Sequence, residues 1–425
     1  MKVNKWTKGL AAAGVVSLAS AAQAGDANET VMTAVSSTTL SGYVSVSALW
    51  NPGTGNGTAA AAAAAVPGVG AGIGIAGQPF RGGTALAQDG FAADVVSLSV
   101  SKPLDESEWA AGYNAQLWYA ETSGSGTAPG LSAGGGVQLK NANIDLRVPV
   151  GNGIDLKVGI FDSIIGYEAS DYNANPNYTR NYGWGIEPTT HEGVLASYAV
   201  NDLLSVSAGV ANSYGVTAGG NANVRNESIK SYMASVAITA PDSAGFLAGG
   251  SLYGGVVNGR AAATTAAGNG ADTTSLYVGA TIPTPVEGLA AGIGWDYRLN
   301  NGANTFSATV PGAAGKTRGA GWASALAGYL SYDVTEKVAV HYRVDWAQGS
   351  NGSFGYTRAA GDDEHQNKLL ANTITVDYKA WENVISRLEV RWDHALDGNK
   401  IYGGGDAADG DVNDVAIIGN FIYQF

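Results

Sequence analysis

The sequence has no cysteine and only four histidines among its 425 residues. Without cysteine, an exported chain has neither a disulfide framework nor thiol chemistry. The histidines are His191, His341, His365 and His394, and a wall or loop position explains each better than a role as catalytic base. Asp393 and His394 are adjacent, so a strand would point them to opposite faces and away from each other. We therefore expect no enzyme, no cofactor and no metal site.

Charged residues are scarce, and basic residues are scarcer than acidic ones. Charged residues make up 14% of the chain, with 23 Lys and Arg against 36 Asp and Glu, and the pI is near 4.7. Soluble surfaces usually carry more charge, because about a quarter of the residues of a soluble protein are charged. Nucleic-acid binding needs a basic footprint, which this composition does not provide. We therefore expect no nucleic-acid partner and no ordinary soluble surface.

Long apolar runs are also missing, although a membrane helix needs ~20 apolar residues. The nearest is the alanine run 59–65, but Val66-Pro67 and a glycine-rich stretch follow it, so we expect a loop there. The mean hydropathy is nevertheless 0.00. A membrane barrel with one apolar and one polar face gives such an average, because the two faces cancel.

The end of the chain carries the clearest pattern. Residues 414–425 alternate with a period of two, which is the repeat of a β-strand. The apolar face of this segment consists of Val415, Ile417, Phe421, Tyr423 and Phe425. Asn420 and Gln424 point to the other face, and a lipid-facing barrel strand needs this arrangement. The terminal aromatic residue Phe425 resembles the signal that the barrel-assembly machinery of bacterial outer membranes reads.

The N-terminus predicts export. It combines a basic stretch with Lys2, Lys5 and Lys8, a short apolar core and an A-x-A cleavage site at 22–24. This is the layout of a secretory signal peptide, whose core is too short for a membrane helix. We expect cleavage of residues 1–24, a short periplasmic lead at 25–39 and one barrel domain at 40–425.

Segments of about ten residues with one apolar face recur along the whole chain. They predict an all-β fold, a transmembrane antiparallel β-barrel of about 16 strands (range 14–18). The expected strands are 40–50, 91–101, 108–120, 137–148, 154–162, 191–200, 203–214, 228–239, 246–258, 273–282, 288–299, 320–332, 336–347, 368–379, 384–394 and 414–425. Short and long connections alternate between them, as periplasmic turns and extracellular loops do in outer-membrane barrels. Aromatic residues near strand ends, such as Trp50 and Tyr423, fit the two membrane–water interfaces.

The polar faces of several strands are densely charged. Unpaired buried charges would be too costly for the core of a soluble sandwich, but such a face can line water. The wall residues expected to line a pore are His341, Arg343, Asp345, Arg387, Glu389 and Arg391. Acids expected to face bases across or along the wall are Asp145, Asp155, Asp345, Glu389 and Asp393, and the bases are Arg147, Lys157, Arg343, Arg387 and Arg391.

The long connection 163–190 mixes aromatic rings with charges of both signs, and we expect it to fold into the barrel and narrow the pore. Its candidate constriction residues are Tyr167, Glu168, Asp171, Tyr178, Arg180, Tyr182, Trp184 and Glu187. An outward-packed cap on neighbouring loops is the alternative. Two other motifs carry less weight: the G-x-G-x-x-G match at 72–77 lacks its βαβ context, and the acidic segment around Asp409 only imitates a calcium loop.

A resemblance to a known family rests on this same region. Its elements are Phe161-Asp162, Gly166-Tyr167-Glu168, Asn175-Pro176-Asn177-Tyr178-Thr179-Arg180, Pro188-Thr189-Thr190-His191-Glu192-Gly193 and Tyr198. In this order they resemble the central motif of the OmpL-like β-barrel porin family. Glu192 stands where threonine is commoner in that family. The resemblance covers about 161–202 and implies a pore in a bacterial outer membrane.

Together these patterns predict an outer-membrane porin for passive diffusion of small hydrophilic solutes and ions. The acid excess predicts a cation bias, because it enriches counter-ions at the mouth. The partners expected are outer-membrane lipid and lipopolysaccharide, the barrel-assembly machinery, the solutes themselves and, by analogy with porins of this size, a homotrimer. The open alternatives are a sugar-specific channel, a plugged surface or adhesion barrel and, least favoured, a barrel hydrolase.

Overall fold

The structure is a computed structural model. It describes residues 38–52, 90–120, 136–214, 230–260, 272–301, 321–350, 353–355, 366–399, 402 and 411–425. The expected signal peptide, the alanine-rich stretch, His365 and Asp409 lie outside these ranges. Among the described residues, no helix is long and apolar enough to cross a membrane.

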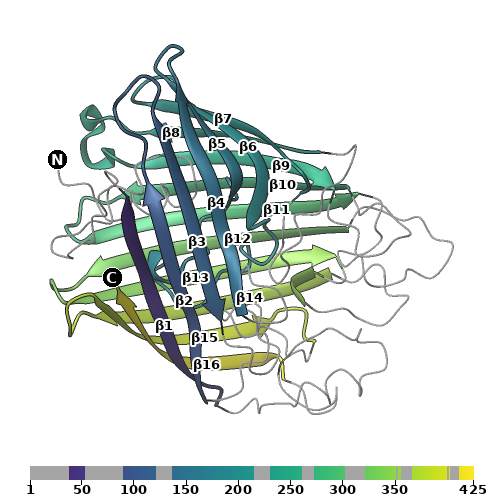
Figure 1. The fold of residues 1–425 in the computed structure, drawn as a ribbon. Coiled ribbons are helices and arrows are strands. Elements are labelled where there is room, and N and C mark those ends of the chain that lie inside the picture. Colours follow the sequence, from purple (N-terminus) through teal and green to yellow (C-terminus); the bar gives the residue numbers. More distant parts are fainter. Residues whose placement is uncertain are drawn as a thin grey trace.

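The described chain forms one closed antiparallel barrel of sixteen strands (Figure 1). The strands are β1 (Thr39–Trp50), β2 (Gly90–Lys102), β3 (Ala111–Ala120), β4 (Gly136–Val148), β5 (Ile154–Asp162), β6 (Thr190–Ala199), β7 (Leu204–Ala211), β8 (Ser231–Thr239), β9 (Ser251–Arg260), β10 (Asp272–Pro283), β11 (Leu289–Asn301), β12 (Gly321–Asp333), β13 (Val338–Ser350), β14 (Gln366–Tyr378), β15 (Val384–Ala395) and β16 (Asn413–Gln424). Each strand pairs with its neighbours in sequence, and β16 closes the ring on β1. The expected fold class and all sixteen expected strands are therefore confirmed.

The predicted strand boundaries hold to within a few residues, with one larger exception. The strand expected at 246–258 begins only at Ser251, because Asp242–Leu247 form a 3-10 helix, η3. Gly245 interrupts that helix with a φ of 65°. The turn between β8 and β9 is therefore longer than the sequence predicted.

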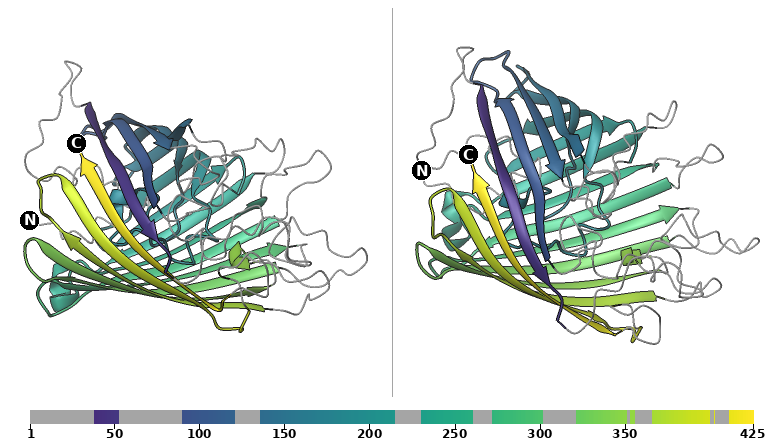
Figure 2. Two further views of the ribbon diagram at one scale, coloured as in Figure 1. Left: turned by 90° about the horizontal axis from the view of Figure 1, so that it is seen from below. Right: turned by 60° about the horizontal axis from the view of Figure 1, so that its bottom comes forward.

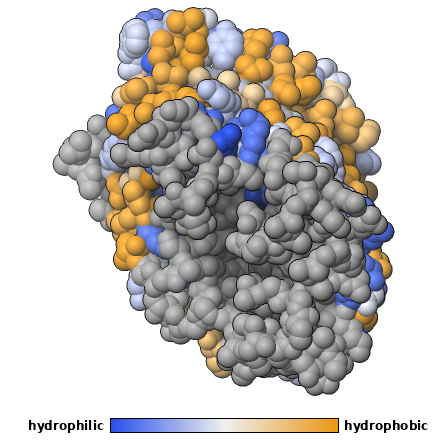
Figure 3. All heavy atoms as spheres, turned by 90° about the vertical axis from the view of Figure 1, so that its right-hand side faces the viewer, coloured by the Kyte–Doolittle hydropathy of each residue, from blue (hydrophilic) through white to orange (hydrophobic). Residues whose placement is uncertain are grey.

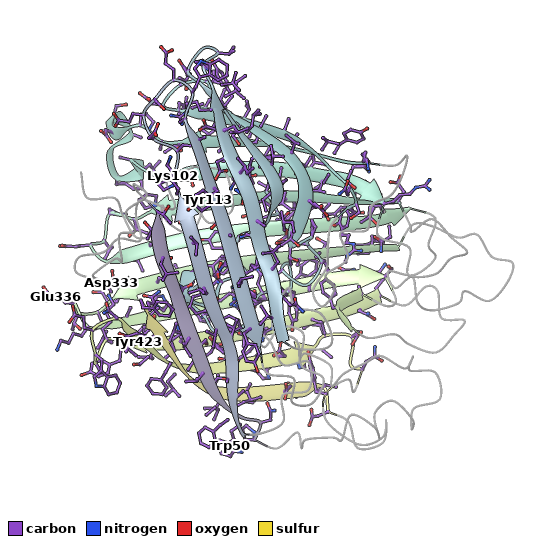
Figure 4. All side chains as sticks on the ribbon, viewed as in Figure 1. Trp50, Lys102, Tyr113, Asp333, Glu336 and Tyr423 are labelled. Carbon is purple, nitrogen blue, oxygen red and sulfur yellow. The ribbon has the colours of Figure 1, made fainter. Side chains whose placement is uncertain are left out.

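Inward and outward residues alternate along the strands as the hydrophobic pattern predicts. In β15, Arg387, Glu389 and Arg391 are buried inside, whereas Leu388 and Val390 are exposed outside. Outward aromatic residues lie near both ends of the strands: Trp50 is 55% exposed and Tyr423 51%. Figure 4 shows these two side chains at different ends of the barrel wall. Rings at both interfaces are typical of membrane barrels.

The short connections and the C-terminus lie at one end of the barrel, on the left and at the top in Figure 1, which we call the turn end (Figures 1 and 2). The opposite end, where the strands joined by the long connections stop, is the loop end. Figure 3 views the molecule from the loop end. Apolar residues lie around the outside, and hydrophilic residues gather in the upper middle of this view.

Two β-bulges break the alternation, one on β2 and one on β4. Between β1 and β2, Ser45 pairs with Val95 and Val46 with Ala93, so Asp94 is an extra residue. Between β3 and β4, Gln116 pairs with Asn141 and Leu117 with Leu139, so Lys140 is extra. A bulge re-aims a side chain, and here both extra ionisable residues are buried in the wall.

Candidate functional site

The connection between β5 and β6, which we call the inner loop (163–189), lies inside the barrel. Most of its side chains are buried, including Tyr172, Tyr182 and Arg180, each with no exposed surface. Its only regular element is the short 3-10 helix η2 (Tyr172–Ala174). Side chains from many strands bond the remaining backbone, so the inner loop depends on the wall for its shape.

The inner loop reaches two opposite walls within a few residues. The Tyr167 ring stacks on Tyr329 with centroids 4.1 Å apart and lies directly over Gly292 of β11. Asp171 accepts a hydrogen bond from Nε2 of Gln116, on β3, at 2.8 Å. The strands β3 and β11 are eight positions apart in a ring of sixteen and therefore face each other. The segment 167–171 thus bridges the barrel interior.

Strands β13 and β15 hold the middle of the inner loop with charged side chains. Arg343 donates to the carbonyl oxygen of Thr179 at 2.6 Å and to Glu168 at 3.0 Å. Arg391 donates to the carbonyl oxygen of Arg180 at 2.6 Å. Glu389, in contrast, accepts hydrogen bonds from backbone N–H groups of the inner loop. These buried charges therefore serve a loop backbone that has no secondary structure of its own to satisfy it.

A further arginine holds the start of this segment. Arg387 donates to the carbonyl oxygens of Tyr172 and Asn175 at 3.0 Å and 2.5 Å. Carbonyl oxygens at the end of a short helix lack partners within the helix, and a cation there is favourable. The three arginines of β13 and β15 thus contact successive parts of one loop.

The two bulged residues hold the inner loop from the other side. Asp94 accepts hydrogen bonds from the Tyr178 hydroxyl at 2.9 Å and from Ser45 and Ser47 of β1. Lys140 forms an ion pair with Asp162 at the end of β5, where the inner loop begins. Burial raises the pKa of Asp171 in the inner loop, and the positive charge of Lys140 partly opposes this rise. Each bulge therefore places a charge where the inner loop docks.

The second half of the inner loop packs on an apolar wall. Tyr182 and Ile186 form one buried cluster with inward residues of β12 to β15, which are mostly alanine. Those alanines are Ala323, Ala325, Ala347, Ala371 and Ala395. Small wall residues leave the room that the larger loop side chains fill. The Tyr182 hydroxyl also donates to Asp393 at 2.6 Å.

Near its end the inner loop meets β11 through acidic groups. Glu187 and Asp296 are hydrogen-bonded to each other and almost completely buried. Burial, followed by the charge of Asp296, raises the pKa of Glu187 well above its usual value.

The expected site residues of the inner loop and of β13 and β15 are brought together by these contacts. The opposite charges pair along the wall: Arg343 with Asp345 at 2.9 Å, and Arg391 with Asp393 at 2.7 Å. Arg147 likewise bonds Asp155 on the adjacent strand at 2.7 Å. His341 bonds Ser331 at 2.6 Å. Trp184, with 2% of its surface exposed, is buried with the rest of the inner loop. That these residues line a pore stays a prediction.

Sequence reasoning missed four residues that contact the inner loop or adjoin its start, namely Asp94, Gln116, Lys140 and Asp296. The bulges had a readable signal. In β2 the outward residues are Phe91 and Ala93 and then Val96, so the phase of the apolar pattern shifts by one at Asp94. A similar shift between Leu139 and Ala142 marks Lys140.

Comparisons with known proteins agree with this architecture. A model of the family described as "Putative beta-barrel porin-2, OmpL-like" matches residues 37–425. No curated protein matches the sequence. Among solved structures, OmpT of Vibrio cholerae is 11% identical with a TM-score of 0.52, over 94% of this chain and 100% of that one. The outer membrane channel DcaP of Acinetobacter baumannii is 13% identical with a TM-score of 0.55, over 93% and 99%. An anion-selective porin from Comamonas acidovorans is 11% identical with a TM-score of 0.54, over 92% and 99%.

Proposed function

Because the chain belongs to the OmpL-like β-barrel porin-2 family, a family of outer-membrane channels rather than enzymes, we propose that it allows passive diffusion of small hydrophilic solutes and ions. The inner loop is the constriction in this proposal. The residues that surround the passage come from the inner loop and from β13 and β15. No bond is made or broken in such transport, so the side chains act through size and charge.

The bridge between opposite walls is the observation that carries this proposal. Tyr167 lies on β11 and Asp171 is bonded to β3, yet the two residues are only four positions apart in the sequence. Four residues span at most about 14 Å of backbone. A sixteen-stranded barrel without such a loop would leave a wide aqueous channel. The inner loop therefore restricts passage to small solutes in this proposal.

A cation bias is the second part of the proposal. Acidic residues outnumber basic ones by 36 to 23 in the chain, and a mouth with negative potential enriches cations. The fold alone leaves the sign open, since one similar structure is an anion-selective porin. Side-chain charge must therefore set the selectivity here.

The test is single-channel conductance in a planar bilayer with a salt gradient across it. The proposal expects stable current steps and a reversal potential shifted toward the cation. Arg180→Gln should change both quantities, because Arg180 lies in the constriction. Asp333→Asn, at the last residue of β12 and far from the inner loop (Figure 4), is the matched control and should change neither. Equal cation and anion permeability would contradict the bias.

A plugged barrel is the main competing function, and the buried inner loop favours it as a second candidate. Protein shown to be folded that gives no current steps at any voltage would support the plug and an adhesion role. A sugar-specific channel predicts instead that one sugar blocks the ion current in a saturable way. The current record thus separates the three functions.

Export and assembly complete the proposal. We propose that residues 1–24 are removed as a signal peptide, which the N-terminal sequence of the protein from outer membranes would test. We also propose a homotrimer in the membrane, by analogy with a Vibrio cholerae OmpT structure described as a trimer form. Cross-linking in intact membranes that stops at the monomer would contradict the trimer.

A further inference from the structure

A buried pair of carboxyl groups joins the inner loop to β11. Glu187 of the inner loop is 4% exposed and Asp296 of β11 is 2% exposed, and the two side chains share a hydrogen bond. Both carboxyl groups lie directly on loop backbone. A Cβ on Gly166 would lie 2.1 Å from a Glu187 oxygen, and one on Gly183 would lie 2.2 Å from an Asp296 oxygen. The pair is therefore enclosed by backbone, with no space for larger groups.

No cation compensates this pair among the described residues, since none of their salt bridges includes Glu187 or Asp296. The nearest acid, Glu168 of the inner loop, is itself bonded to Arg343. The other titratable groups around the pair are Tyr167 of the inner loop, Tyr277 of β10, Tyr214 after β7 and Arg298 of β11. Arg298 bonds Asn300 and lies over the Tyr214 ring. One oxygen of each carboxyl group in the pair lacks a hydrogen-bond partner.

Two carboxylates in contact without a cation cannot both be ionised, so such a pair shares a proton. We propose that Glu187 and Asp296 form a proton-binding site that latches the end of the inner loop to β11, and that loss of the shared proton releases this latch. The hydrogen bond needs this proton, because a carboxyl group donates only through its O–H and a carboxylate has none. Without it, two negative charges repel each other in a buried site.

The direction of the pH dependence follows from linkage. Burial raises the pKa of Glu187 in the latched state, whereas a released glutamate in water titrates near an ordinary pKa of about 4.3. The latched state therefore binds more protons. Latching is favoured at low pH and weakens as pH rises through the raised pKa of Glu187.

Hydrogen exchange of the backbone amides in 183–189 measures the latch without requiring a pore. The exchange rates of wild-type protein and Glu187→Gln are compared at each pH between about pH 5 and pH 9. The intrinsic base catalysis of amide exchange is the same for both proteins and cancels in the ratio of the two rates. A carboxamide donates to the Asp296 carboxylate at every pH, so the variant keeps a proton-independent latch. The ratio of wild-type to variant exchange should rise with pH by up to about tenfold per unit, the slope for one linked proton.

A pH-independent ratio would overturn the proposal. If Glu187→Gln does not fold, Asp296→Asn offers the same comparison with the carboxamide on the wall. Asp333→Asn is the control for a general change of charge and should keep the wild-type pH dependence. Wild-type protection that is lost with a metal chelator at alkaline pH would also overturn the proposal, because it would assign a cation instead of a proton.

The effect on transport is a separate consequence and rests on the proposed function. If the inner loop is the constriction, wild-type current should fluctuate more as pH rises, and Glu187→Gln current should not. Exchange that follows pH without any current at any pH would keep the latch and reject the pore. Current without pH-dependent exchange would keep the pore and reject the latch.

Discussion

The carboxylate of Glu389 on β15 accepts the backbone N–H groups of Tyr178 and Thr179 at 2.6 Å and 3.0 Å. The Thr375 hydroxyl donates to the same carboxylate at 2.8 Å. Three donors thus surround a buried anion with no exposed surface. Charge-assisted hydrogen bonds of this kind contribute about 1.5 to 3 kcal/mol each. Glu389 is therefore a principal anchor of the inner loop.

Replacing Glu389 by alanine should loosen the inner loop without unfolding the barrel. The change leaves two buried N–H groups without acceptors, and we expect docking to weaken by roughly 3 kcal/mol. Hydrogen exchange of residues 177–180 should then accelerate by about a hundredfold. Glu389→Gln keeps one acceptor oxygen and should show a smaller effect. Unchanged exchange in the alanine variant would show that Glu389 does not hold the inner loop.

Strand periodicity explains why so much of the fold could be predicted from the sequence. Outward positions meet lipid and inward positions meet polar surroundings. Successive residues of a strand therefore alternate between apolar and polar, as Leu388 and Glu389 do. The path of the inner loop has no such period. Its contacts join residues far apart in sequence, such as Tyr178 and Asp94, and only folding brings them together. The sequence predicted the loop's importance from its composition and left its partners open.

Replacing Arg343 should disturb the inner loop, whereas replacing Arg147 should not. Arg343 is fully buried and bonds Glu168, Asp345 and the loop backbone, so Arg343→Met leaves two buried carboxylates unpaired. Breaking a buried ion pair costs about 3 to 5 kcal/mol, and we expect larger current fluctuations and faster exchange at Thr179. Arg147→Met removes a partly exposed pair with Asp155 and should change neither. Equal effects of the two variants would contradict this ranking.

A side chain at Gly292 should displace Tyr167 from the wall. A Cβ there would lie 1.9 Å from the Tyr167 hydroxyl oxygen, so Gly292→Ala forces the ring to move, at a cost of about 1 to 3 kcal/mol. Since the Tyr167 ring is one end of the bridge across the interior, we expect a changed conductance. Gly328→Ala on the neighbouring β12 meets its nearest atom only at 3.4 Å and is the matched control. Identical conductance in the two variants would exclude a role for this contact.

Removing the charge of Asp94 should affect the inner loop more than the barrel. Asp94→Asn keeps the bulge but weakens the acceptor for the Tyr178 hydroxyl and for two serines of β1. We expect faster exchange around Tyr178 with unchanged migration of the folded barrel on gels. Deleting residue 94 removes the bulge but leaves a regular strand, because Val95 and Ala93 can still pair with Ser45 and Val46 and point to the same faces as before. The barrel should therefore still fold while exchange around Tyr178 becomes faster, and unchanged exchange in the deletion variant would show that the bulge does not hold the inner loop.

Closure of the barrel should depend on Gly42 as well as on Phe425. Gly42 and Phe425 exchange backbone hydrogen bonds at 3.0 Å and 3.1 Å. A Cβ on Gly42 would lie 2.2 Å from the carbonyl oxygen of Ser97 on β2 and 2.7 Å from the Phe425 ring. Gly42→Ala should therefore displace both the β2 backbone and the ring, and destabilise the seam around β1 by about 1 to 3 kcal/mol. The measurement is the temperature at which the heat-modifiable band of the folded protein disappears on a gel.

The partner strand offers a matched control for this seam. Gly419 of β16 has no atom within 4 Å of an added Cβ. Gly419→Ala should leave the melting temperature unchanged or raise it slightly, because alanine is favoured over glycine in a strand by about 0.5 to 1 kcal/mol. Gly42→Ala should lower the melting temperature even in the Phe425→Ala background, since the contact with the Ser97 carbonyl oxygen remains when the ring is gone. A double variant no less stable than Phe425→Ala alone would show that Gly42 acts on closure only through the ring.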